Sequence, residues 1–329
     1  MKTIPILPSE QRLNFCKMVF IVQTLCTASV ASAQESRTAF SFLRLPVSAH
    51  AAALGGDNIS LVEDDAMLAM HNPALLYNVG DKTLSLGYMH YMEGVKVAGA
   101  AFNKTWGSRA SWGVSAQYID YGSMTETTYD WQQTGTFTAK DIAVGGTLAY
   151  DLGSNFTGGI TARMLSSHIG QYSSLAAVVD LGLNYYNPES ELSISAVVRS
   201  LGGQLEAYDD DFERMPTDLQ VGLTKRFVGA PLRFSVTAVR LNDWEIHGLG
   251  HHLVVGADVL LGSQFYVSVG YNALRAQEMK IDSGDSSSSH GAALSFGAGL
   301  TLQRLKARVS YGKYHVSSTA LLLNFSYQL

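Results

Sequence analysis

The chain has 329 residues, a formal net charge of -5, 47% hydrophobic residues and only 16% charged residues. Soluble domains usually have about 25% charged residues, so this sequence has too few charges to cover a large surface that faces water. Part of the surface should therefore face lipid or another protein. The mildly acidic balance argues against nucleic-acid binding, which needs a cationic surface.

Residues 1–33 have the pattern of a cleaved export signal. Arg12 and Lys17 precede a short apolar run, and Ala31 and Ala33 form an A-x-A site, so we expect cleavage before Gln34. The alternative is an uncleaved anchor helix. It is disfavoured because the apolar run is too short to span a bilayer as a stable helix.

Cleavage would also remove both cysteines of the chain, Cys16 and Cys26. A lipoprotein signal at Cys26 is not expected, because the preceding residues lack the small side chains that such a signal needs. The mature chain would then have no disulfide, metal thiolate or cysteine nucleophile. Its formal charge would be -7, since the signal removes three positive residues and one negative residue.

Residues 34–80 do not alternate between apolar and polar residues, and we predict that they form an N-terminal hatch, or plug. Asp64 or Asp65 is expected to open a short helix that ends before Asn72 and Pro73. After this segment, no apolar run approaches the roughly 20 residues of a membrane-spanning helix.

Residues 81–329 alternate with a period of two, which predicts strands with two unlike faces. In one of these strands Trp112 and Val114 lie on the apolar face, and Ser111 and Gly113 lie on the other. About fourteen strands are expected, an even number that is typical of bacterial outer-membrane barrels. We therefore predict an all-β fold, a transmembrane antiparallel β-barrel. Strand starts are expected near residues 82, 94, 111, 139, 155, 174, 190, 217, 231, 251, 264, 290, 305 and 318.

Short and long connections alternate through the middle of the chain, as periplasmic turns and extracellular loops do. A soluble β-sandwich is the alternative, but its polar face usually carries many Lys and Glu residues, whereas here that face is small and weakly charged. The charged side chains expected to face inward should pair in sign across the lumen, because a lone buried charge is costly. The expected long connections lie near 123–138, 168–174, 202–216, 242–250 and 277–289. The expected inward charges are Asp141, Asp151, Arg163, Asp180, Arg199, Arg233, Asp258, Lys306 and Arg308.

Two short motifs in the hatch segment resemble the N-terminal hatch of FadL-like outer-membrane proteins. They are the small-residue run that ends in Leu54, Gly55 and Gly56, and the sequence Asn72, Pro73 and Ala74. Within that group the chain is most similar to the PorV/PorQ family of the type IX secretion system, and to its PorQ type. The start Phe42-Leu43-x-Leu45-Pro46 favours this resemblance.

The resemblance implies a non-enzymatic subunit of the type IX attachment complex in the outer membrane. Such a subunit would anchor the surface protein PorZ beside PorU and PorV, and the long loops near 123–138, 202–216 and 277–289 would bind these partners. The alternative is a FadL-like transporter of hydrophobic small molecules. That function needs an apolar pocket near the hatch and a lateral opening in the barrel wall.

We expect no catalytic, cofactor or metal site. Ser310 and Lys313 match a serine-x-x-lysine pattern, but they lie in an alternating strand, where residues three apart point to opposite faces. His247, His251 and His252 are interpreted as part of a solvated loop, because no carboxylate follows them at a spacing typical of metal sites.

Overall fold

The computed structural model describes residues 38–329, apart from 93, 128–129, 131, 210, 244–247, 280, 284–285, 289–290, 292 and 316–317. The predicted signal peptide, with Ala31, Ala33 and Gln34, lies outside the described residues. No helix in the described part of the chain is long and apolar enough to cross a membrane.

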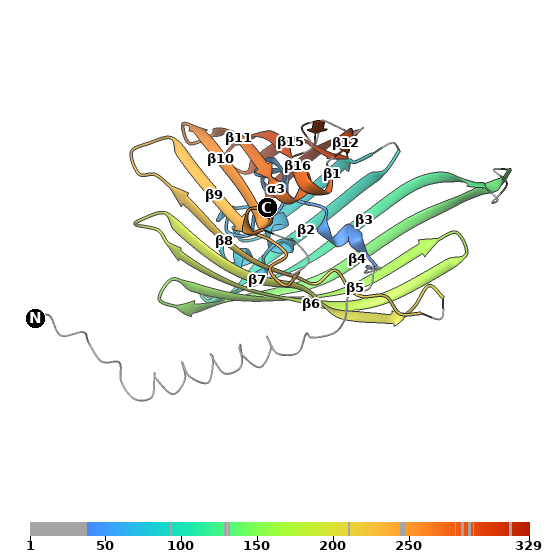
Figure 1. The fold of residues 1–329 in the computed structure, drawn as a ribbon. Helices are drawn as coiled ribbons and strands as arrows, with labels where there is room; N and C mark the ends of the chain where they lie inside the picture. The colour runs from blue at the N-terminus through green and yellow to red at the C-terminus, as the bar shows by residue number, and fades with distance from the viewer. Residues whose placement is uncertain are drawn as a thin grey trace, which may run out of the picture. The chain divides into compact units, whose positions relative to one another are not determined.

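Fourteen antiparallel strands form a closed barrel in which neighbours along the sheet are neighbours in the sequence (Figure 1). The first and last strands close the barrel, with a ladder that runs from Thr83 opposite Gln328 to His90 opposite Leu321. The predicted all-β transmembrane barrel of about fourteen strands is therefore confirmed. The strands are β1 (Thr83–His90), β2 (Lys96–Trp106), β3 (Ala110–Thr127), β4 (Gln133–Gly153), β5 (Phe156–Ile169), β6 (Tyr172–Asn187), β7 (Leu192–Glu206), β8 (Asp218–Arg226), β9 (Leu232–Ala238), β10 (Leu253–Leu261), β11 (Phe265–Asn272), β14 (Leu294–Thr301), β15 (Leu305–His315) and β16 (Ser318–Gln328).

The two faces of the sheet differ as the alternation predicts. Outward side chains are apolar and exposed, such as Val144 at 54% and Phe325 at 51%, whereas the inward Ser115 and Asn324 are buried. Successive side chains of a strand point to opposite faces, so one sequence period produces both surfaces. An apolar exterior around a closed sheet is suited to lipid, because closure leaves no unpaired strand edge in the membrane.

The connections at the two ends of the barrel differ in length. At one end, which we call the turn end, all connections are short. At the other, the loop end, three connections are long, and the last of them contains α3 (Ala273–Glu278) and the small hairpin of β12 (Ile281–Ser283) and β13 (Ser286–Ser288). Outer-membrane barrels have short periplasmic turns and longer extracellular loops, so the loop end is assigned to the cell surface. The turn-end connections are 107–109, 154–155, 188–191, 227–231, 262–264 and 302–304, and the long loops are 207–217, 239–252 and 273–293.

The predictions of long loops near 123–138 and 168–174 are wrong. Most of 123–138 belongs to β3 and β4, which pair as far as Thr127 opposite Gln133, and β5 and β6 are joined by only two residues, 170–171. In the same way β7 extends through the start of 202–216, to Glu206. These extensions are polar and largely exposed, so they lack the alternation that identifies strands although their backbones are paired. The arrows of β3 and β4 reach beyond those of β1 and β2 in Figure 1.

The hatch consists of short helices before the first strand. They are η1 (Ser41–Arg44), α2 (Ala49–Ala53), η2 (Ala66–Met70) and η3 (Pro73–Asn78). Asp65 opens η2 as predicted, since its side chain accepts a hydrogen bond from the Met67 amide at 3.0 Å. Asn72 caps η3 in the same way, with Pro73 at the first helical position, where its missing N–H costs nothing. Both caps are fully buried, so the barrel encloses this part of the hatch.

Candidate functional site: a plugged lumen

Leu54, Gly55 and Gly56 form a turn that presses the hatch against the barrel wall. The backbone of Gly55 has a φ of 108°, and a Cβ at this position would lie 2.3 Å from Cγ1 of Val254 in β10. Only glycine provides both this conformation and this close approach. Leu54 is buried in a small apolar cluster with Leu68 and other hatch residues. This motif therefore docks the hatch on β10 and β11.

Asn72, Pro73 and Ala74 dock the hatch on a second part of the wall. The Asn72 amide group donates a hydrogen bond to the Ile59 carbonyl at 2.9 Å, and its side-chain oxygen accepts one from the Ala74 amide at 3.0 Å. Glycine in the wall makes room for this turn, because a Cβ on Gly159 of β5 would lie 2.4 Å from the Ala74 nitrogen. The two predicted hatch motifs are thus contact points between hatch and wall.

This close approach leads to a stability prediction. Changing Gly159 to Ala should destabilise the folded protein by about 1–3 kcal/mol, because the new Cβ would meet hatch backbone that cannot move aside like a flexible side chain. Gly146→Ala is a matched control, since a Cβ there meets nothing within 4 Å. Urea unfolding in detergent measures both variants. Equal midpoints for Gly159→Ala and Gly146→Ala would show that the hatch does not seat on β5.

A buried group of charged side chains binds the hatch to β9 and β10. His50 of α2 lies between two carboxylates, with Nδ1 2.8 Å from Glu63 Oε2 and Nε2 3.0 Å from Asp258 Oδ1. Arg233 contacts the same two carboxylates, at 3.0 Å from Glu63 and 2.6 Å from Asp258. The ring of His50 stacks on Tyr266 at a centroid distance of 4.0 Å. We call His50, Glu63, Arg233 and Asp258 the His50 cluster.

The acidic pair of the hatch faces two basic residues of β15. Asp64 forms an ion pair with Lys306, and Asp65 lies 3.7 Å from Arg308, which is also 3.9 Å from Glu63. The sequence predicted that Lys306 and Arg308 face inward and are neutralised. The prediction of pairing is correct, but the partners come from the hatch and not from the opposite wall. Each of these pairs gives a charged side chain in the lumen an opposite charge nearby, which offsets part of the cost of burial.

The other expected inward charges also have partners, in the barrel wall or in the hatch. Arg163 forms an ion pair with Asp180 and donates to the Met70 carbonyl of the hatch at 3.0 Å, and Arg199 donates to the Leu43 carbonyl at 2.9 Å. Asp141 accepts a hydrogen bond from the Tyr121 hydroxyl at 2.6 Å. Asp151 lies at the turn end and pairs with the exposed Arg109 at 3.8 Å. Two arginines therefore hold the hatch through its backbone carbonyls.

The His50 cluster should make stability depend on pH. Burial alone would lower the pKa of His50, but the carboxylates of Glu63 and Asp258 outweigh burial and raise it. A raised histidine pKa gives stability that is fully present below the unfolded value, about 6.5, and is lost as pH rises through the folded value. His71, the other buried hatch histidine, has its pKa lowered to about 3 by burial and by Arg199 and Arg163, so it stays neutral throughout.

We therefore expect the urea midpoint to fall as pH rises above about 6.5. His50→Gln should flatten this part of the profile, because glutamine keeps a polar side chain but cannot carry the proton. Unfolding curves between pH 5 and 9 measure the effect for both proteins. A decline of equal size in His50→Gln would assign the pH dependence to other groups.

The loop-end half of the lumen is apolar on one side. Inward side chains of β1 to β6 and β16, such as Met89, Ile119 and Leu165, are buried against Phe40 and Phe42 of the hatch. The two rings contact each other edge to face at 6.2 Å, and Phe40 also stacks on Tyr208 at 6.3 Å. We call residues 38–45 the plug segment. It fills an apolar chamber, whereas the lumen of a porin for polar solutes is lined by polar residues.

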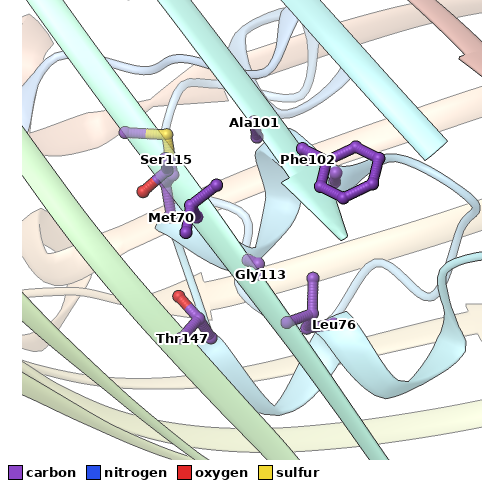
Figure 2. A pocket seen from close by; sticks show the side chains of 10 residues that line it. Met70, Leu76, Ala101, Phe102, Gly113, Ser115 and Thr147 are labelled. Atoms are coloured by element: carbon purple, nitrogen blue, oxygen red, sulfur yellow. The ribbon is translucent and has the colours of Figure 1, made fainter. Parts of the chain in front are cut away.

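At the turn end, only a narrow gap lies between the hatch and strands β2 to β4. Figure 2 shows Met70 and Leu76 of the hatch beside Gly113 and Ser115 of β3. The gap that they line has a volume of about 10 Å³. A cavity needs roughly 10–15 Å³ by this measure to hold a single water molecule. This gap between the hatch and strands β2 to β4 is therefore too small for a ligand.

The sequence missed the residues that fill and hold this lumen. Phe42 and Leu43 stood only in a family-like start motif, and nothing in the pattern gave them a place inside the barrel. Glu63 to Asp65 gave a usable signal, because three carboxylates in an apolar segment need cationic partners. His50 gave none, since a single histidine in an alanine run is uninformative.

Comparison of the sequence with protein-family models and with curated proteins finds no match. Solved structures with a similar fold do exist. The CymD monoaromatic hydrocarbon channel superposes with a TM-score of 0.56 at 13% identity, covering 86% of this chain and 97% of CymD. The toluene transporter TodX of Pseudomonas putida has a TM-score of 0.54 at 13% identity, with 86% and 97% covered. At such identity the likeness establishes the outer-membrane barrel fold and nothing finer.

Proposed function

We propose that this chain is an outer-membrane channel protein that admits small hydrophobic molecules through a lumen closed by its own plug segment. The apolar lining of the loop-end half carries the proposal. Met89, Ile119 and Leu165 are at most 1% exposed and face inward, at positions where a channel for polar solutes would have polar side chains. A hydrophobic molecule can replace Phe40 and Phe42 there, because apolar contact is not directional.

The similar structures support the proposal further. CymD and TodX are described as a monoaromatic hydrocarbon channel and a toluene transporter, and their barrels match most of this chain. Entry would begin with displacement of the plug segment at the cell surface. Onward passage would require the hatch to move away from strands β2, β3 and β4, because the gap between the hatch and these strands is only about 10 Å³.

Uptake of radiolabelled toluene by intact cells tests this function. Cells that produce the protein should accumulate toluene faster than cells with an empty vector, and uptake of arabinose, a polar molecule, should not differ between them. Heat-dependent migration on a gel confirms in each case that the barrel is folded. Equal toluene uptake with and without a folded barrel in the outer membrane would refute the proposal.

Anchoring within a type IX attachment complex is the second candidate. The polar extensions of β3 and β4 favour it, because their side chains between Ser123 and Thr136 are mostly exposed on both faces, outside the apolar band. Paired strands that project from a membrane give a protein such as PorZ a rigid surface to bind, with PorU and PorV as further partners.

Co-purification from native outer membranes tests this second candidate. The complete protein should recover surface proteins of the PorZ type. A variant in which 123–138 is shortened to a tight turn should lose them while its barrel still migrates as folded. If the complete protein recovers no surface partner, the anchoring function is wrong, and the toluene experiment is unaffected.

A further inference from the structure

A second cavity lies at the loop end of the barrel, beside the plug segment. Its volume is about 180 Å³, and it is bounded by η1 of the hatch, the start of β8, the end of β9, and α3. Its lining includes three arginines, Arg44, Arg240 and Arg275, and two tyrosines, Tyr91 and Tyr314. Tyr314 and Tyr91 also pack against the apolar chamber, but the chamber and the ion pairs described above account for neither the cavity nor its three arginines.

Arg275 brings an unused hydrogen-bond donor to this cavity. The residue is 7% exposed, its Nη2 donates to the Gly55 carbonyl at 2.9 Å, and its guanidinium lies 4.0 Å from the centre of the Tyr314 ring. Its Nη1 has no hydrogen-bond partner among the described residues. A buried guanidinium N–H without an acceptor is unfavourable, so a bound acceptor would satisfy it.

Two more buried polar atoms of the cavity can donate a hydrogen bond. Nε of Arg44 and the hydroxyl of Tyr314 are buried without a partner in the described part of the chain. A ligand that offers several acceptor oxygens, such as a carboxylate, could satisfy these groups together with Arg275.

The carboxylates around the cavity are already engaged. Glu278 pairs with Arg240 at 2.6 Å, and Asp218 accepts a hydrogen bond from the Arg240 amide at 2.7 Å. Burial and the Asp218 carboxylate raise the pKa of Asp57, and the nearby arginines Arg199, Arg275 and Arg240 partly offset this increase. None of these carboxylates accepts a hydrogen bond from Arg275 Nη1 or Arg44 Nε, so both of these donors are available to an acceptor on a ligand.

The size and the apolar part of the lining restrict the rest of the ligand. A cavity of about 150 Å³ accommodates benzene, so about 180 Å³ leaves room for one ring and a small substituent. Leu45, Leu274 and Met279 supply apolar surface beside the two tyrosines. We infer that this cavity binds a single-ring aromatic carboxylate, with the carboxylate at Arg275 and Arg44 and the ring against the apolar side chains. The inference rests on the proposed function. It names a class of ligand that would bind at the loop end of the channel, on the cell-surface side.

Calorimetric titration of the purified full-length protein in non-ionic detergent tests the inference. Benzoate should bind more tightly than toluene, which lacks the carboxylate, and than acetate, which lacks the ring. Arg275→Gln should weaken benzoate binding by about 30-fold or more, because one partner of a buried charge pair is lost. Arg226→Gln is the control, since Arg226 is an exposed arginine in an ion pair at the turn end and should leave benzoate binding unchanged.

Arg44→Gln provides a second variant if loss of the Gly55 contact unfolds Arg275→Gln, and it should also weaken benzoate binding. The inference is overturned if benzoate binds no better than toluene or acetate, or if a folded variant at Arg275 or Arg44 retains the original affinity. The cavity would then hold water only. Toluene uptake without benzoate binding would refute this inference but not the proposed channel function. Benzoate binding without toluene uptake would refute the proposed channel function.

Discussion

Asp258→Asn should lower the free energy of unfolding by about 3–5 kcal/mol, because it removes the more deeply buried of the two carboxylates that pair with Arg233 and His50. Asp258 is 1% exposed and touches both cations, at 2.6 Å and 3.0 Å, and it also accepts a hydrogen bond from Ser268 at 2.5 Å. Asparagine has almost the same shape, so the loss would come from the charge. The effect is large because the cluster joins hatch and wall away from water, where unpaired charges are costly.

Urea unfolding followed by heat-dependent gel migration measures this effect. Asp151→Asn is the matched control: it removes the same charge from a partly exposed pair with Arg109 at the turn end. Exposed pairs contribute about 0–1 kcal/mol, so its midpoint should stay near that of the original protein. Equal changes in the two variants would mean that the His50 cluster does not hold the hatch.

The double change Phe40→Ala and Phe42→Ala should open the loop-end chamber. Each ring is 4% exposed, and truncation of a buried phenylalanine usually costs about 3–5 kcal/mol. The lost packing energy destabilises the plug segment and not the barrel, because the fourteen strands keep their backbone hydrogen bonds and their lipid-facing side chains. The plug segment should therefore leave its apolar site while the barrel remains folded.

Uptake of the hydrophobic dye N-phenylnaphthylamine by intact cells measures the opening. The double variant should admit the dye several times faster than the original protein. Phe156→Ala is the control, because Phe156 is 40% exposed on the outer surface and contacts Tyr185 there. Dye uptake at the original rate in a folded double variant would show that these rings do not close the lumen.

The barrel could be predicted from the sequence because one local pattern determines it. Val114 faces lipid and Ser115 faces the lumen. Because successive residues of a strand point to opposite faces, the alternation in the sequence assigns such residues to the two surfaces without knowledge of the fold. The same rule fails at 123–138, where both faces meet water. Nothing there alternates, so the end of β3 and the beginning of β4 were expected to form a loop.

The hatch could be predicted only in part. Asp65, Asn72 and Pro73 are local signals for helix starts, and the structure uses them as such. The contacts of His50 with Asp258 and of Asp64 with Lys306 join residues more than 200 positions apart, so no local pattern contains them. The inward apolar residues Ile119 and Leu165 continue faces that are otherwise polar, and only the position of the plug segment explains the change.

The most direct test of the central claim is to tether the plug segment and measure toluene uptake. Thr38 pairs with Arg214 of the loop 207–217 in an isolated β-bridge, and paired strands lie about 4.7–4.9 Å apart, a spacing that a disulfide can span. The only cysteines of the chain are Cys16 and Cys26, so a Thr38→Cys and Arg214→Cys variant would have one defined pair beyond the signal. We predict that cells with the oxidised variant take up toluene far more slowly than cells with the reduced variant, and that each single-cysteine variant behaves like the original protein. Equal uptake in the oxidised and reduced states would contradict a lumen that opens by displacement of the plug segment.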